Sequence, residues 1–243
     1  MSKEKRPVPA GTQTKSETRS GRAEIDAFVR HARAVATGRD AGHGRLILAL
    51  DATMSRQPTW DLACDLQGEM FDAAARSGRL DVQLAYFRGF GECRSSRFVD
   101  SSAELKSLMV RIVCQAGVTQ IGKVLAHALK ENAAGRVHAL VYIGDAMEEN
   151  IDILAAQAGE LGVRGVPVFV FQEGHDGAAE AAFKSIARLS KGAWFRFDRS
   201  SADILARLLA SIAIFATGGV KALESRGAQS DRLLIGRLRG EES

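Results

Sequence analysis

A carboxylate and two hydroxyls stand at alternate positions in the segment Asp51-Ala52-Thr53-Met54-Ser55. The preceding residues, RLILAL at 45–50, predict a short buried strand, so this segment falls where a strand gives way to a loop. At such a turn the three side-chain oxygens can converge on one hard cation. Mg²⁺ prefers near-octahedral oxygen ligands at about 2.0–2.1 Å and keeps several waters. The segment therefore predicts a Mg²⁺ site, and Mn²⁺ or Ca²⁺ accept the same oxygen ligands.

Two more oxygen-bearing residues occupy comparable places further along the chain. Thr119 follows Gly117 at the expected start of a helix, and Asp145 comes just after the apolar run VHALVYI at 137–143. In sheets of parallel strands, functional groups gather at the carboxyl ends of the strands. Each residue alone has a simpler explanation, because Ser, Thr and Asp also cap helices and close turns. Their joint placement at strand ends is what favours a metal site.

The rest of the chain alternates between buried strands and amphipathic helices. Strands are expected at 45–50, 82–87, 93–99, 137–143, 166–171 and 193–197. Helices are expected at 60–76, 101–114, 119–129, 151–161, 182–189 and 200–212. Ser101 with Glu104 predicts a capping box, and Ser200 with Asp203 predicts a cap for the last helix. This order indicates an α/β domain with a mostly parallel sheet covered by helices on both faces.

The order of elements and the three polar motifs resemble the von Willebrand factor A (VWA) domain family. The metal ion-dependent adhesion site (MIDAS) of that family consists of an Asp-x-Ser-x-Ser string, a distant Thr and a distant Asp. The matching segments are DATMS, GVTQIGKVLAHAL and HALVYIGDAMEE, and the resemblance covers residues 44–218. It implies a three-layer, doubly wound fold: a mostly parallel six-stranded sheet with one antiparallel edge strand.

The resemblance also implies roles for the five candidate residues. Thr53, Ser55 and Thr119 would offer hydroxyl oxygens to Mg²⁺, while Asp51 and Asp145 would bind it directly or through water. The sixth position would take an Asp or Glu carboxylate from a protein partner.

Two departures from the family pattern concern the site. Thr53 stands where Ser is commoner, which preserves the hydroxyl. The family's usual Thr-Asp-Gly is Gly144-Asp145-Ala146 here, which keeps the acid but loses a hydroxyl and a glycine. A metal-free VWA scaffold therefore remains an alternative.

A second alternative is a Mg²⁺-dependent phosphatase similar to the haloacid dehalogenase family. Its nucleophile would be Asp51, with Thr53 as helper. The acidic motif G-D-x-x-x-D of that family is close to GDAMEE at 144–149, and Lys123 or Lys130 would neutralise the phosphate. That interpretation leaves the segment GVTQIGKVL unexplained, whereas the VWA resemblance uses it. We therefore expect a metal-dependent protein-interaction domain and not an enzyme.

Composition sets further expectations. The hydrophobic content of 46% and charged content of 26% are ordinary for a globular protein, and the three cysteines form no Cys-x-x-Cys pair, which predicts reduced thiols. Residues 1–22 contain no apolar leader segment. The longest apolar run, at 208–220, is shorter than the ~20 residues of a membrane span. These features predict a cytoplasmic protein without membrane contact.

The positive charge belongs to the N-terminal part of the chain. Residues 1–40 carry nine Lys and Arg and five Asp and Glu, which accounts for the whole net charge of +4. No basic strand with aromatic residues and no zinc-finger spacing indicates nucleic-acid binding. We expect a disordered basic arm at 1–22, a short helix and linker at 23–43, the VWA-like domain at 44–218 and a loose tail at 219–243.

Overall fold

The computed structural model describes residues 42–54, 57–197 and 202–240. Its strands are β1 His43–Asp51, β2 Arg79–Arg88, β3 Glu92–Val99, β4 Ala139–Gly144, β5 Val168–Glu173 and β6 Ala193–Phe197. Its helices are α2 Gln57–Ala74, α3 Ser102–Met109, α4 Ile121–Ala134, α5 Ile151–Val163, α6 Gly177–Leu189, α7 Ala202–Arg226 and α8 Gln229–Arg239. The expected arm at 1–22 and most of the segment 23–43 lie outside the described residues.

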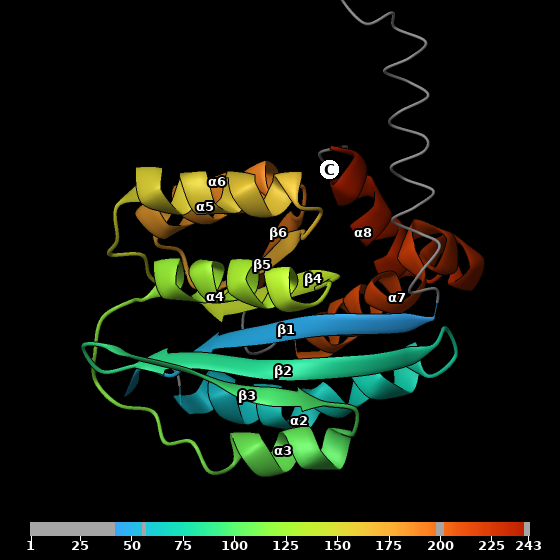
Figure 1. Cartoon of the computed structure of the whole chain (residues 1–243), viewed down its shortest axis with the longest axis horizontal. Helices are drawn as coiled ribbons and strands as arrows, with labels where there is room; N and C mark the ends of the chain where they lie inside the picture. Colours follow the sequence, from blue (N-terminus) through green and yellow to red (C-terminus); the bar gives the residue numbers. More distant parts are fainter. Residues whose placement is uncertain (1–41, 55–56, 198–201, 241–243) are drawn as a thin grey trace, which may run out of the picture. The chain divides into compact units, whose positions relative to one another are not determined.

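The strands form one six-stranded sheet in the order β3-β2-β1-β4-β5-β6 (Figure 1). All neighbouring strands are parallel except β3, which pairs antiparallel with β2 at one edge. The predicted fold class is thereby confirmed. The parallel strands run in one direction, so their carboxyl ends all lie at the same end of the sheet. These strands are β1, β2, β4, β5 and β6.

Alternating side chains of the central strands supply two separate cores. Leu46, Leu48 and Leu50 of β1 are buried on the face that α2, α3, α7 and α8 cover. Ile47 and Ala49 point to the opposite face, which α4, α5 and α6 cover. A strand buried on both faces needs apolar residues at consecutive positions. The continuous apolar run RLILAL therefore predicts such a strand. The two cores hold β1 and β4 rigidly at the centre of the sheet.

The helix expected at 101–114 ends earlier, at Met109. Ser101 caps it as predicted, since its hydroxyl accepts a hydrogen bond from the Glu104 amide at 3.4 Å. Beyond the helix, the backbone amide of Gln115 donates to the Ala52 carbonyl at 3.0 Å. The Gln115 amide thus bonds to the turn after β1 and not to a preceding helical turn, a contact that helical periodicity does not reveal.

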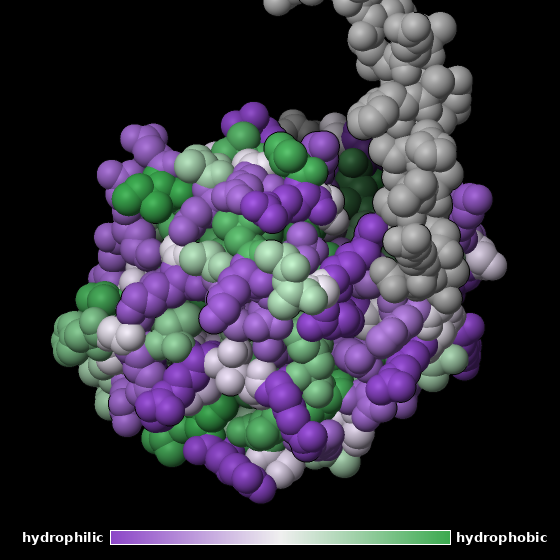
Figure 2. All heavy atoms as spheres, in the orientation of Figure 1, coloured by the Kyte–Doolittle hydropathy of each residue, from purple (hydrophilic) through white to green (hydrophobic). Residues whose placement is uncertain are grey.

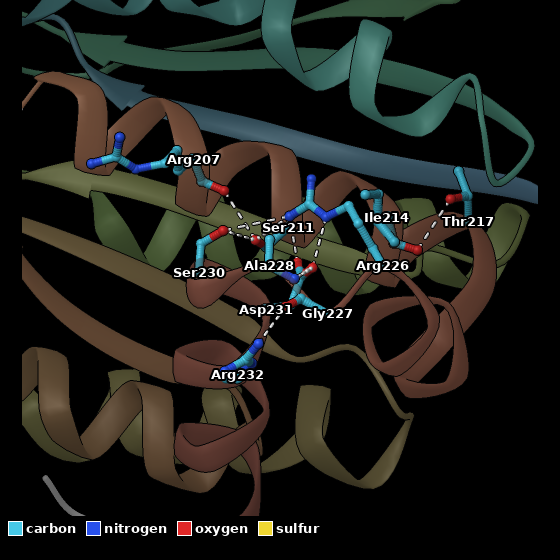
Figure 3. A network of polar contacts seen from close by, with 10 residues as sticks. All are labelled: Arg207, Ser211, Ile214, Thr217, Arg226, Gly227, Ala228, Ser230, Asp231 and Arg232. Atoms are coloured by element: carbon cyan, nitrogen blue, oxygen red, sulfur yellow. Dashed lines mark hydrogen bonds and ion pairs between the residues drawn. The ribbon is translucent and has the colours of Figure 1, made fainter.

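The tail expected to be loose from residue 219 is helical through α8, so this expectation was wrong for 219–240. The backbone bends at Gly219, whose φ of 66° lies in the left-handed region, and α8 then packs back on α7. Arg226 pairs with the fully buried Asp231 (Figure 3), and Leu234 of α8 is also buried. The sequence alone predicts that charged residues such as Arg226 and Asp231 are exposed to solvent. Their pairing depends on how α8 folds back on α7, which the sequence pattern does not show. The Ser200 cap lies outside the described residues.

Helix α7 is the element of the described residues that is long and apolar enough, by length and composition, to cross a membrane. It packs against β1 and α2, which buries most of its apolar stretch. A Cβ on Gly44 would lie 2.8 Å from the Ala216 carbonyl oxygen, so the helix and β1 are in close contact. The apolar run at 208–220 is accounted for by this packing.

Candidate functional site

A pocket of about 310 Å³ opens at the carboxyl ends of β1 and β4. It is lined by Asp51, Thr53, Met54, Ala116, Gly117, Thr119, Asp145, Ala146 and Glu148. Four of the five candidate residues therefore lie together, although they come from three separate segments. The fifth, Ser55, lies outside the described residues.

The turn after β1 is built around Asp51, whose side chain is only 4% exposed. One of its carboxylate oxygens accepts a hydrogen bond from the Thr53 amide at 2.7 Å, which closes an Asx turn. The Ala52 amide donates to the Phe87 carbonyl at 2.9 Å and so ties the turn to β2. This arrangement directs Asp51 and Thr53 to the same pocket.

Thr119 joins the pocket through reciprocal bonds with Glu148. The Glu148 amide donates to the Thr119 hydroxyl, the Thr119 amide donates to the Glu148 carboxylate, and both distances are 3.0 Å. The next carboxylate, Glu149, accepts from the first amides of α4, at Ile121 and at Gly122 (2.9 Å). A negative charge at a helix N-terminus is favourable because it meets the unpaired amides there.

Glu148 and Glu149 therefore bond to the start of α4, although in sequence they directly precede α5. Helix α5 has its own N-cap, Asn150, whose side chain accepts from the Asp152 amide at 2.9 Å. The N-cap of α4, Gln120, makes no side-chain cap bond, and Glu149 takes that role from a distant loop. The sequence signal was indirect: α4 lacks a good cap while two acids precede a helix that has one.

Gly117 allows the loop before α4 to touch the β2–β3 turn. A Cβ at this position would lie 2.2 Å from the Gly89 carbonyl oxygen, a distance that no side chain tolerates. The adjacent Val118 amide donates to the same oxygen at 3.1 Å. The Gln120 side-chain amide donates to the Arg88 carbonyl at 3.2 Å. The Gly-Val-Thr segment thus fixes the loop that carries Thr119 at the sheet edge (Figure 1).

No protein-family model and no curated protein match this chain. Several solved structures, however, match this chain in fold. The von Willebrand factor type A protein from Catenulispora acidiphila has a TM-score of 0.58 and 15% identity, covering 73% of this chain and 43% of that one. The SpRpn10 VWA domain has a TM-score of 0.55 and 13% identity, covering 72% and 97%.

A third match is the structure of proximal thread matrix protein 1 from the mussel byssus with a zinc-occupied MIDAS motif. It has a TM-score of 0.54 and 17% identity, and the match covers 80% of this chain and 52% of that one. This chain has the von Willebrand factor A fold. At such low identities the likeness establishes the VWA fold alone, and this chain spans about half the length of two of these proteins.

The main departure from the VWA motif has a packing reason. A Cβ on Gly144 would lie 2.4 Å from the hydroxyl oxygen of Tyr142, which sits on the same face of β4. The Tyr142 ring is buried, stacked on Phe87 with centroids 6.4 Å apart and in edge contact with Phe183 at 5.6 Å. The aromatic side chain of Tyr142 therefore fills the space that a side chain at position 144 would need.

The donor chemistry of the pocket fits a hard cation. Asp51 and Asp145 supply carboxylates, Thr53 and Thr119 supply hydroxyls, and the lining residues in the described part of the chain include no Lys or Arg. No group of three or more His, Cys, Asp or Glu poised to hold a metal occurs within the described ranges. A VWA-type donor set is not such a group, because it combines two acids with hydroxyls. Oxygen donors of this kind favour Mg²⁺ over soft metals, which prefer sulfur ligands.

Proposed function

We propose that this chain is a divalent-cation-dependent protein-interaction domain. Asp51, Thr53, Ser55, Thr119 and Asp145 would hold Mg²⁺, with Mn²⁺ or Ca²⁺ as substitutes, and the cation would supply an electrophilic centre for an Asp or Glu side chain of a protein partner. The observation that carries the proposal is the convergence of four of these residues, from three segments, on one pocket. The proposal places the domain in the cytoplasm, without membrane contact.

Exposed apolar side chains around the pocket favour a protein as the ligand. Met54 lines the pocket and is 64% exposed, and Phe90, in the β2–β3 turn, is 85% exposed. Val118 is bonded to that turn through its amide, and Val113 is 63% exposed with its carbonyl accepting from Arg88 at 2.6 Å. Figure 2 shows apolar residues at the side where this turn lies. Exposed apolar side chains that cluster on one part of a surface are typical of protein-interaction sites.

The phosphatase alternative requires a lysine beside Asp51. The ammonium of Lys123 donates instead to the Gly91 carbonyl and to the Gln120 side chain, both at 2.8 Å. Lys123 and Lys130 line a different pocket. With no lysine or arginine among the described lining residues, the candidate site suits a cation better than a phosphate group.

Calorimetric titration of Mg²⁺ into chelator-stripped protein tests the proposal. We expect saturable one-site binding to the wild type and none to Asp51→Ala or Thr119→Ala. The matched control is Asp72→Ala, which removes an exposed carboxylate from α2 and should bind like the wild type. Absence of binding to the wild type would favour the metal-free scaffold. Asp51-dependent hydrolysis of p-nitrophenyl phosphate would instead favour the phosphatase.

The partner's carboxylate is tested separately with a random peptide library displayed on phage and eluted with EDTA. We expect the enriched peptides to share an Asp or Glu next to apolar residues, and to lose binding when that acid becomes Asn or Gln. Peptides that remain bound in EDTA would contradict a role for the cation.

A further inference from the structure

A second pocket, of about 330 Å³, lies between the edge strand β3 and helix α4. We call it the basic pocket; it is lined by Cys93, Arg94, Ser95, Lys123, Ala126, His127 and Lys130. Three of these residues are Lys or Arg and one is His, and the lining in the described part of the chain includes no acid. None of the residues that line the metal pocket lines this one.

The concentration of basic side chains is local. Residues 41–243 carry 24 Lys and Arg and 24 Asp and Glu, so the body of the protein has no excess of positive charge. The acids next to the pocket in sequence are shared or paired: Glu92 binds Arg94 of the pocket at 2.8 Å and also Arg88 at 3.0 Å, and Glu131 pairs with Arg45 at 3.8 Å. One Glu shared between two arginines leaves a net positive charge at this end of the pocket.

Two lysines of the basic pocket keep their charge available. Lys123 donates to neutral oxygens, those of Gly91 and Gln120, which orient its ammonium without neutralising it. Lys130 is exposed and forms no ion pair within the described ranges. Lys123, His127 and Lys130 are spaced i, i+4 and i+7, so they share one face of α4. His127 is fixed on that face by a 2.8 Å bond between its ring and Gln83.

The basic pocket and the metal pocket lie along the same helix. Thr119 immediately precedes the N-cap of α4, and Lys130 stands near its far end. At 1.5 Å per residue, the helical rise from Ile121 to Lys130 is about 14 Å, and the residues that lead back to Thr119 add about 2 Å or more. An extended peptide covers that distance in about five residues, at about 3.3 Å each. One partner segment can therefore reach both pockets.

We propose that the basic pocket binds an acidic segment of the partner polypeptide, about five residues from the carboxylate that completes the metal site. The proposal rests on the proposed function for that spacing, but the binding of acidic polypeptide at the pocket does not need the cation. Arg94, Lys123 and Lys130 would bind the carboxylates, and the groove between β3 and α4 would hold the extended backbone.

Anisotropy of a fluorescent hexaglutamate peptide, at low ionic strength and in EDTA, tests the pocket alone. We expect binding to the wild type and a loss of about tenfold or more in Arg94→Glu/Lys130→Glu, since two attractions become repulsions. The matched control, Arg207→Glu/Lys221→Glu, makes the same charge change on exposed positions of α7, across the sheet, and should bind within about twofold of the wild type. Circular dichroism checks that each variant is folded.

Each other outcome overturns the proposal. No binding to the wild type, or equal loss in the control, would reject the pocket without affecting the metal site. Asp51→Ala should bind hexaglutamate in EDTA as the wild type does, and a loss there would assign the peptide to the metal pocket. Tighter binding of a hexauridine RNA with the same residue dependence would assign the pocket to nucleic acid.

The spacing is tested in Mg²⁺ with peptides that carry one Asp and a Glu pair. We expect tighter binding when five residues separate them than when they are adjacent, and loss of this gain in Arg94→Glu/Lys130→Glu. Equal binding of the two peptides to the wild type would show that the pockets do not share a ligand.

Discussion

The pair Gly144 and Tyr142 shows how a single position can depend on a neighbour two residues away. Gly144→Ala places a Cβ 2.4 Å from the Tyr142 hydroxyl, and the ring is held by aromatic contacts on both sides. We expect a loss of about 1–3 kcal/mol in the free energy of unfolding, measured by urea denaturation. Tyr142→Leu in the same chain should recover part of that loss, so the two effects are not additive.

Gly159→Ala in α5 is the matched control for this prediction. Nothing lies within 4 Å of a Cβ at that position, so the same substitution should stabilise the protein by about 0.5–1 kcal/mol through helix propensity. A Gly144→Ala variant as stable as the wild type would show that β4 shifts without cost.

His127 makes a prediction about pH. Burial lowers the pKa of His127 below its ordinary value, and this outweighs the opposing attraction of Glu131. Between the lowered pKa and about 6.5, the unfolded chain binds more protons than the native protein, so stability falls as the pH falls through that window. His127→Gln removes this contribution. We expect the melting temperature of the wild type to fall more than that of the variant between about pH 8 and pH 5; parallel curves would contradict the burial of a neutral ring.

At the residue scale, the sequence predicted what local motifs encode. Asp51, Thr53, Thr119 and Asp145 could be proposed together because each follows a strand or precedes a helix. The roles of Glu148, Glu149 and Tyr142 could not be predicted. Glu148 and Glu149 act across two loops about thirty residues apart, and the fit of Tyr142 against Gly144 is visible only once β4 is built.

At the scale of elements, α7 and α8 depend on one ion pair. Burial by itself would raise the pKa of Asp231, but hydrogen bonds from Arg226, Ser211 and the Ala228 amide outweigh it and lower that pKa. The Arg226 guanidinium donates to Asp231 at 2.7 Å and also to Ser211 at 2.8 Å (Figure 3). The carboxylate is fully buried, so it depends on these donors.

Arg226→Ala should therefore cost about 3 kcal/mol or more of stability in urea denaturation, because it leaves a buried carboxylate unpaired. The control, Arg239→Ala, breaks the exposed pair with Glu224, both partners of which are more than half exposed, and should cost less than about 1 kcal/mol. Equal costs in the two variants would mean that α8 is not held by the buried pair.

Strands were predictable as elements because each carries its own apolar run, and all six strands lie where that pattern indicated. The ends of the helices could not be predicted in the same way. Helix α3 stops at Met109 and α7 continues past Ile212, because their ends are decided by bonds to distant loops and by the pairing of Arg226 with Asp231. Local periodicity carries no information about such contacts.

At the scale of the whole molecule, residues 41–243 have balanced charge, and the positive excess lies in residues 1–40. Because the sequence of residues 1–22 is polar, we expect that deleting them leaves the melting temperature within about 2 °C of the wild type. A fall of more than about 4 °C, which is at least 1 kcal/mol for a chain of this size, would show that the arm stabilises the body.

The proposed function requires that the pocket between the ends of β1 and β4 binds a divalent cation. The most direct measurement is titration of Mn²⁺ into isotope-labelled protein, because the paramagnetic ion broadens only nearby amide signals. We predict early, selective broadening at Thr53, Thr119 and Asp145, lost in Asp51→Ala and reversed by excess Mg²⁺. Broadening centred elsewhere, such as around Glu69 and Asp72 on α2, or none at all, would contradict the claim.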